Sequence, residues 1–304
     1  MLEHHGPDSP QALRDMPFMW NLFQFCLVLP LGCALTTFAL TRAIGVNDAY
    51  VAPWVTFLSL FAIYVFDRVF ETDGDIENHA IRSAFFKRNK GLLKLTASVA
   101  LILSIGLGFL GYGIYGAGFA LLPFIAVILY SIGGAIPVGR FRLRIPQLKK
   151  IPGVKNLTVA ITLSTLITGL SAVAAPVGVA IPLLLILWAF LLLRFLINTI
   201  TFDLRDIAGD TAAGTRTIAT LWGKNQTLRM LHGLNCLIGG GLIVVAILYD
   251  PATRITLWLL PSSLFTASYL WWIGSRPVKN VVYDVLVDGE ITFWGLLICA
   301  SSLI

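Results

Sequence analysis

The sequence predicts an all-α integral membrane protein, a bundle of nine transmembrane helices with a polar cap on the cytoplasmic side. Of its 304 residues, 57% are hydrophobic and only 12% are charged, and the mean hydropathy is +0.82. Soluble domains usually contain about 25% charged residues, so this composition excludes an ordinary soluble protein. The apolar runs and the positions of the basic residues give the number and the orientation of the helices.

Nine apolar runs are long enough to cross about 30 Å of hydrocarbon. They cover residues 17–41, 49–66, 93–113, 117–137, 157–176, 179–201, 229–249, 254–274 and 290–304. The connections near residues 113–116 and 176–179 are short, which leaves the boundaries there open. We expect a single nine-helix domain over residues 16–304, after a disordered polar tail over residues 1–15 that lacks the features of a removable signal peptide.

The basic residues support this topology. With the N-terminus in the cytoplasm, twenty of the 22 lysines and arginines fall on the inner side, and only Arg42 and Arg254 fall outside. This is the asymmetry of multi-pass membrane proteins, and it accounts for the net charge of +6 without a nucleic-acid partner. The four cysteines lie in apolar runs without CxxC spacing, so we expect neither a disulfide nor a zinc site.

An acidic stretch directly follows the apolar run that ends near residue 201. Asp203, Asp206 and Asp210 are spaced i, i+3 and i+7, which would put the three carboxylates on one helical face. Like charges so close repel one another unless a cation lies between them, and oxygen ligands suit Mg²⁺, which often bridges carboxylates to phosphates. A diphosphate held by Mg²⁺ is the first hypothesis, and a solvated loop after a membrane helix is the alternative.

A second acidic stretch follows the run that ends at residue 66. Asp67, Glu71 and Asp75 are spaced i, i+4 and i+8, and the two stretches together contain eight of the 16 acidic residues. Both follow helices that end on the inner side. We therefore expect the two groups of carboxylates to form the two halves of one site.

Candidate cations surround these stretches. Arg82 and Arg216 follow the first and the second stretch, and the proline-containing segment 129–156 is expected to form a basic loop over the site. Arg194 and Asn198 lie inside an apolar run. A buried arginine is usually paired, so Arg194 is expected to neutralise a carboxylate or to bind phosphate. The acidic segment 283–290 is expected to be solvated, with a lesser role in capping the site.

With these motifs in place, the chain resembles the UbiA superfamily of intramembrane prenyltransferases. Asp203-x2-Asp206-x3-Asp210, followed by Gly214-x-Arg216-Thr217 and Gly223, is similar to the second aspartate-rich motif of that family. The first motif departs from the family pattern Asn-x3-Asp-x3-Asp, since this chain has Asp67-x3-Glu71-x3-Asp75. A register through Ile63, Asp67 and Glu71 is an alternative.

The resemblance implies a Mg²⁺-dependent enzyme that moves an isoprenoid from a prenyl diphosphate to a hydrophobic acceptor, aromatic or lipid, within the bilayer. Two Mg²⁺ ions would be held by the catalytic carboxylates Asp67, Glu71, Asp75, Asp203, Asp206 and Asp210. The diphosphate would be bound by Arg82, Tyr130, Arg140, Arg142, Lys149, Arg194, Asn198 and Arg216.

The same residues leave three other functions open, and the third of them is the least favoured. A relative with this fold would close the isoprenoid into a cyclic terpene instead of transferring it. A silent lipid-binding relative is compatible with the altered first motif. A transporter is disfavoured, because the carboxylates lie at the inner ends of helices while transporter sites tend to lie at the middle of the membrane.

Overall fold

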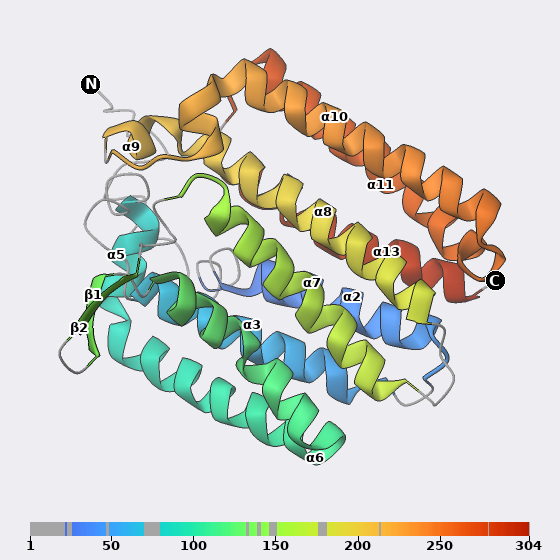
Figure 1. The fold of residues 1–304 in the computed structure, drawn as a ribbon, viewed down its shortest axis with the longest axis horizontal. Helices are drawn as coiled ribbons and strands as arrows, with labels where there is room; N and C mark the ends of the chain where they lie inside the picture. The colour runs from blue at the N-terminus through green and yellow to red at the C-terminus, as the bar shows by residue number, and fades with distance from the viewer. Residues whose placement is uncertain are drawn as a thin grey trace, which may run out of the picture.

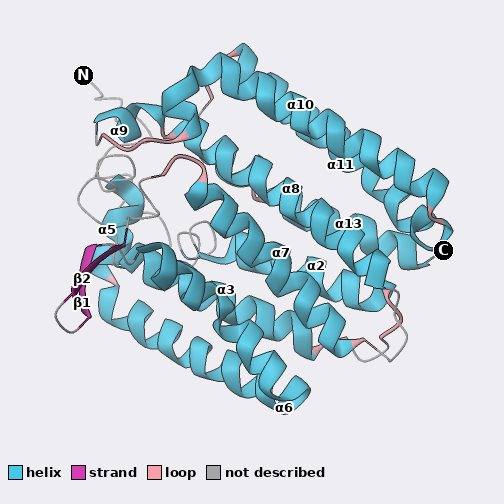
Figure 2. Cartoon of the chain, in the orientation of Figure 1, coloured by secondary structure: helices cyan, strands magenta, loops and turns pink. Residues whose placement is uncertain are grey.

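The computed structural model describes residues 22, 26–46, 49–69, 80–131, 134–138, 141–145, 151–175, 181–212, 214–278 and 280–303. Helices make up nearly all of this part of the chain (Figure 2). The elements are α2 (Val28–Ala43), α3 (Val51–Val69), α5 (Ala80–Arg88), α6 (Lys90–Ser131), β1 (Gly134–Val138), β2 (Phe141–Ile145), α7 (Val154–Ala174), α8 (Ile181–Arg205), α9 (Ile207–Ala212), α10 (Ile218–Leu248), α11 (Asp250–Ser275), α12 (Asn280–Leu286) and α13 (Gly289–Leu303).

The long helices form a bundle in which neighbours along the chain pack against one another. Packing runs in the order α2, α3, α6, α7, α8, α10, α11 and α13, and α13 returns to pack against α2. The short elements α5, β1, β2 and α9 all lie at one end of this bundle (Figure 1). The C-terminal ends of α3 and α8 lead into that end, as the sequence predicts for the two acidic stretches.

Helix α6 is bent back on itself, so that the chain reverses within one long helical segment (Figure 1). The helical conformation breaks at Tyr112 and at Gly113, whose φ of +61° is one that glycine adopts without strain. The two arms approach closely: a Cβ on Gly108 would lie 2.6 Å from the carbonyl oxygen of Gly116. The short connection predicted near residues 113–116 is this break.

Helices α2 and α13 are close neighbours because small residues line their contact. A Cβ on Gly295 would lie 2.9 Å from Cγ of Leu35, so a larger side chain there would push the helices apart. The hydroxyl of Thr36 also donates a hydrogen bond to the carbonyl oxygen of Ile291, at 3.0 Å. This contact closes the bundle between its first and last described helices.

Hydroxyl groups connect other helices through the apolar core. Thr41 of α2 and Ser171 of α7 share a hydrogen bond of 3.0 Å, and Ser59 of α3 donates to the carbonyl oxygen of Ala120 of α6 at 2.7 Å. All these hydroxyl-bearing residues are buried. Hydrogen bonds of this kind are common between helices that pack in a membrane.

The outer surface of the bundle is apolar. Leu110, Ile247 and Leu248 are 83%, 75% and 78% exposed, and five of the described helices are long and apolar enough to cross a bilayer. A surface of this kind faces lipid. The chain is a multi-pass integral membrane protein, and the count of nine crossings stays a prediction.

The segment between α6 and α7 contains a two-stranded antiparallel hairpin. We expected the fourth apolar run to continue to residue 137, but α6 ends at Ser131 and β1 begins at Gly134. Gly134 and Pro137 are unfavourable in a helix, which explains the early end. In the hairpin register Pro137 lies opposite Arg142 and Ala135 lies opposite Arg144. The expected structured loop therefore includes a hairpin.

Candidate functional site

The second acidic motif lies where α8 ends and α9 begins. Asp203 is in the last turn of α8, Asp206 is in the bend between the helices, and Asp210 is in α9. Backbone hydrogen bonds continue through the bend, from the N–H of Asp206 to the carbonyl of Phe202 and from the N–H of Asp210 to the carbonyl of Asp206. The helical spacing predicted for the three carboxylates is thus interrupted only locally.

The chain turns after Asp210 because a glycine and a helix-capping threonine follow it. Gly214 has a φ of +67°, which ends α9 in a conformation that glycine favours. Thr217 then caps α10: its hydroxyl accepts a hydrogen bond from the N–H of Thr220, and the Thr220 hydroxyl accepts one from the N–H of Thr217. Gly214 and Thr217 of the predicted signature are therefore turn and cap residues, and Arg216 between them is exposed.

Asp203 is the most buried carboxylate of the motif. It is 4% exposed and accepts a hydrogen bond of 2.9 Å at Oδ2 from the side-chain amide of Asn156, which is 2% exposed, at the start of α7. The neighbouring Lys155 is close enough to interact electrostatically with the carboxylate. An ionised carboxylate accepts about four hydrogen bonds or cation contacts, so Asp203 retains capacity for a further ligand.

Asp206 is held by Arg205, an arginine that is not among the predicted site residues. Arg205 donates from Nε to Oδ1 of Asp206 at 2.8 Å and from Nη2 to Oδ2 at 3.1 Å. Its third nitrogen, Nη1, donates to Oδ1 of Asp284 in α12 at 2.7 Å. The signal for Arg205 was its place inside the motif, directly before Asp206.

The segment 283–290 is packed against α8, so the expectation that it is solvated is wrong. Asp288 is 7% exposed and Glu290 is fully buried. Asn198 of α8 donates to the carbonyl oxygen of Val287 at 3.0 Å and to Oδ1 of Asp288 at 3.4 Å. Burial raises the pKa of the Asp288 carboxyl to about 7; the charge of Asp284 adds to this, and the Asn198 hydrogen bond opposes it.

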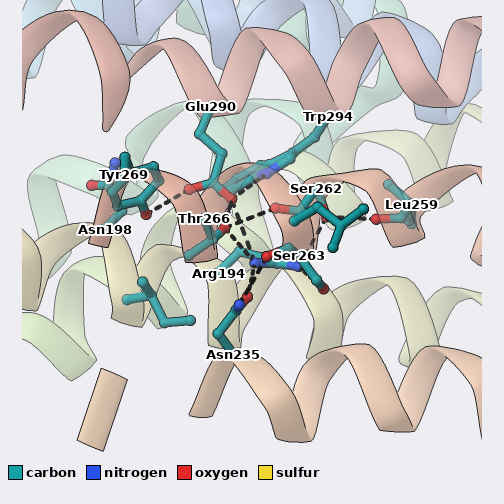
Figure 3. A network of polar contacts seen from close by, with 12 residues as sticks. Arg194, Asn198, Asn235, Leu259, Ser262, Ser263, Thr266, Tyr269, Glu290 and Trp294 are labelled. Carbon is teal, nitrogen blue, oxygen red and sulfur yellow. Dashed lines mark hydrogen bonds and ion pairs between the residues drawn. The ribbon is translucent and has the colours of Figure 1, made fainter. Parts of the chain in front are cut away.

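Arg194 lies in a different environment: it is itself fully buried, and it belongs to a polar network that joins four helices (Figure 3). Its Nη1 donates to Asn235 at 2.8 Å and to Thr266 at 2.7 Å, and its Nη2 donates to Ser262 at 2.9 Å and to Ser263 at 2.6 Å. These partners come from α10 and α11. Nine residues separate Arg194 from Asp203, about 14 Å along α8.

Glu290 of α13 provides the opposite charge in this network. Its Oε1 lies 3.5 Å from Nη1 of Arg194 and accepts hydrogen bonds from Thr266 at 2.6 Å and from Trp294 at 3.0 Å. Its Oε2 accepts a hydrogen bond from Tyr269 at 2.8 Å. Of the two roles expected for Arg194, the structure therefore supports pairing with a carboxylate. It does not bring Arg194 to the acidic motif.

Asp67 is exposed near the C-terminal end of α3. The next residue, Arg68, is close enough to interact electrostatically with Arg205 and with Asp288, which brings the C-terminal end of α3 toward the C-terminal end of α8. Other predicted residues lie outside the part of the chain whose side chains the structure describes. They are Glu71, Asp75, Arg82, Tyr130, Arg140, Arg142 and Lys149.

The described residues do not by themselves complete a metal site. Among them, no three acidic, histidine or cysteine side chains come together as a group that would hold a metal ion. The half of the proposed site that contains Glu71 and Asp75 lies outside that part of the chain. The expectation of two Mg²⁺ ions between the two motifs therefore stays a prediction.

Fold and site together define a multi-pass membrane protein with an acidic motif at the C-terminal end of a long apolar helix. A sequence profile of the UbiA prenyltransferase family matches residues 24–286. The chain belongs to this family. Among curated protein sequences, no relative matches the chain.

Solved structures share the fold. A UbiA homologue from Archaeoglobus fulgidus, bound to DMAPP and Mg²⁺, aligns with a TM-score of 0.59 and 13% identity over 92% of this chain and 99% of the homologue. The same homologue bound to GPP and Mg²⁺ aligns with a TM-score of 0.58, again at 13% identity over 92% and 99%. A structure of digeranylgeranylglyceryl phosphate synthase aligns with a TM-score of 0.56 and 15% identity over 95% of this chain and 98% of the synthase. At such identities, the likeness shows the fold.

Proposed function

We propose that this protein is a Mg²⁺-dependent intramembrane prenyltransferase. It moves an isoprenoid chain from a prenyl diphosphate to a hydrophobic acceptor, an aromatic compound or a lipid. The observation that carries the proposal is the second acidic motif of a UbiA-family chain, with Asp203 buried and held by Asn156 where α8 ends. The homologue bound to DMAPP or GPP together with Mg²⁺ supports the choice of donor and metal.

The donor atoms at the motif fit a hard divalent cation. Carboxylate oxygens are the ligands that Mg²⁺ prefers, and no soft ligand belongs to the motif. We assign the metal to Asp203, Asp206 and Asp210, together with Asp67, Glu71 and Asp75 of the first motif. When bound, Mg²⁺ supplies positive charge that stabilises the leaving diphosphate.

The protein's own residues bind the donor and keep water away from the reaction. Among the described residues, Arg216 is exposed next to the motif and is our candidate for a diphosphate contact. The further candidates are Arg82, Tyr130, Arg140, Arg142 and Lys149. Arg194 and Asn198 are left out of this set, because their side chains are already bound within the bundle. Apolar helices around the isoprenoid would protect an allylic cation from water until the acceptor attacks.

The orientation follows from the charges. We assign the N-terminus and the acidic motifs to the cytoplasmic side, since twenty of the 22 basic residues fall there. The bundle over residues 16–304 is taken as one domain, in which α13 packs against α2.

Diphosphate release tests the proposal directly. Purified protein in detergent is given geranylgeranyl or farnesyl diphosphate, with Mg²⁺ or with EDTA, and with membrane extract as a source of acceptor. We expect release only with Mg²⁺, and a lipid product whose mass is that of the acceptor plus the prenyl group. A product with the mass of the prenyl hydrocarbon alone would indicate a cyclase. No release with either donor, together with no binding of either diphosphate, would overturn the proposal.

A further inference from the structure

Arg205 is held in place on three sides. One edge of its guanidinium forms a bidentate ion pair with Asp206, through Nε at 2.8 Å and Nη2 at 3.1 Å, and Nη1 contacts Asp284 at 2.7 Å. The ring of Phe202 lies beneath it, with Cζ 4.8 Å from the ring centroid. The side chain is only 8% exposed. A guanidinium fixed in this way is a permanent positive charge next to the acidic motif.

The position of Asp284 is fixed as well. Tyr283, the residue before it, is 6% exposed, and Asn198 holds the backbone at Val287 directly after α12. Helix α12 therefore presents Asp284 to Arg205 from a segment distant in sequence, 79 residues along the chain. This contact is a second anchor for the arginine that is independent of the motif itself.

The charges of these groups explain how Asp284 affects cation binding at Asp206. Arg205 and Asp206 alone form a neutral pair, in which the guanidinium opposes any cation that approaches Asp206. Asp284 adds a negative charge on the other side of that guanidinium and so offsets part of its effect at Asp206. The bidentate contact uses one acceptor position on each oxygen of Asp206 and fixes the plane of its carboxylate.

We propose that Asp284 is a positioning residue for the cation site: through Arg205 it orients the Asp206 carboxylate and offsets the charge of the guanidinium, so that Asp206 binds a divalent cation. This inference rests on the proposed function, since it assumes that Asp206 is a metal ligand. It adds a helix, α12, and a residue outside both acidic motifs to the cation site.

The test is a titration of the full-length protein in detergent with Mn²⁺, in which electron paramagnetic resonance measures the free ion. It is performed without ligand and with farnesyl thiodiphosphate, an unreactive donor analogue. For Asp284→Asn we expect the Mn²⁺ dissociation constant to rise about fivefold, which corresponds to ~1 kcal/mol. Asp284→Glu retains the charge and should restore most of the affinity.

A double-mutant cycle separates positioning from a general structural role. In an Arg205→Gln background there is no guanidinium to offset, so Asp284→Asn should have no further effect on the dissociation constant. Additive effects of the two changes would overturn the inference, because Asp284 would then act without Arg205. Arg276→Gln removes an exposed cation that lies over the ring of Trp272, and it serves as the control that leaves Mn²⁺ affinity unchanged.

The remaining outcomes distinguish a failure of this inference from a failure of the proposed function. Equal or tighter Mn²⁺ binding by Asp284→Asn would overturn this inference and leave the proposed function intact. A wild-type protein that binds no Mn²⁺, with or without the analogue, would overturn both. If Asp284→Asn does not fold, Arg205→Lys replaces it: lysine keeps the charge but loses the bidentate contact, so weaker Mn²⁺ binding is expected and unchanged binding contradicts the inference.

Discussion

Helix α8 carries two arginines whose surroundings differ completely. Arg194 is fully buried among neutral donors and acceptors, with Glu290 as its opposite charge, whereas Arg205 at the helix end contacts Asp206 and Asp284. The first joins helices within the bilayer, and the second lies beside the acidic motif. An arginine in an apolar run is thus no guide to the reaction site by itself, and its partners decide its role.

The largest effect is expected at the C-terminal end of α8. Asp203→Asn keeps the size of the side chain and an oxygen that accepts the Asn156 hydrogen bond, but it removes the charge. We expect diphosphate release to fall by at least ~100-fold, the size typical for losing a group that stabilises charge in the transition state. The measurement is turnover with Mg²⁺, and thermal unfolding in detergent controls for the fold. Unchanged turnover would remove Asp203 from the proposed site.

Substitutions in the buried network around Arg194 should change the stability of the protein and leave its turnover nearly unchanged. Arg194→Met leaves Glu290 charged and without its cation in the core, which costs about 3–5 kcal/mol. Adding Glu290→Gln removes the remaining charge and should recover much of that loss. Thermal unfolding of both variants measures this. Per folded molecule, diphosphate release by the double variant should stay within about threefold of wild type, a range of ~0.7 kcal/mol.

A stable double variant without activity would contradict the separate roles of Arg194 and Arg205. It would mean that the network also shapes the reaction site, and that the two arginines of α8 share one function.

A smaller, pH-dependent effect is expected at Asp288, which lies between the two regions. Its pKa is raised to about 7 in the folded protein, mainly by burial, so the folded state binds more protons than the unfolded state between about pH 4 and pH 7. Stability from this group is present at low pH and is lost as the pH rises through 7. Asp288→Asn cannot ionise and should show a smaller fall in Tm from pH 5 to pH 8. An unchanged pH dependence would show that Asp288 does not cause it.

The sequence predicted the long elements well because their physical signals are local. Apolar runs and glycine positions lie within each segment, so the family, the membrane helices and the reversal near Gly113 could all be predicted from the residues. The short hairpin β1–β2 was missed, since the run before it stays apolar up to Val138. Strand pairing depends on contacts that composition does not contain.

The acidic motif of the candidate site could be predicted from the sequence, but the contacts of its neighbouring residues could not, because they join distant segments. Asp203, Asp206 and Asp210 follow a motif, but the partners of Arg194 and Arg205 are 96 and 79 residues away in Glu290 and Asp284. Without the fold, a buried arginine looks like a ligand contact and a distant acidic segment looks solvated. Both interpretations change once α13 is seen to pack within the bundle, so that Glu290 reaches the core.

The buried ion pair also has a consequence for biogenesis. Arg194 and Glu290 are separated by 96 residues, and chains grow at roughly 5–20 residues per second, so α8 is made about 5 to 20 seconds before α13. During that interval the arginine must rely on Asn235, on the hydroxyl groups of α11 as they emerge, on water or on the insertion machinery. A charge in the bilayer core is costly, so the last helix completes the insertion of a helix made much earlier. Assembly of this bundle is therefore expected to finish only after α13 has entered the membrane.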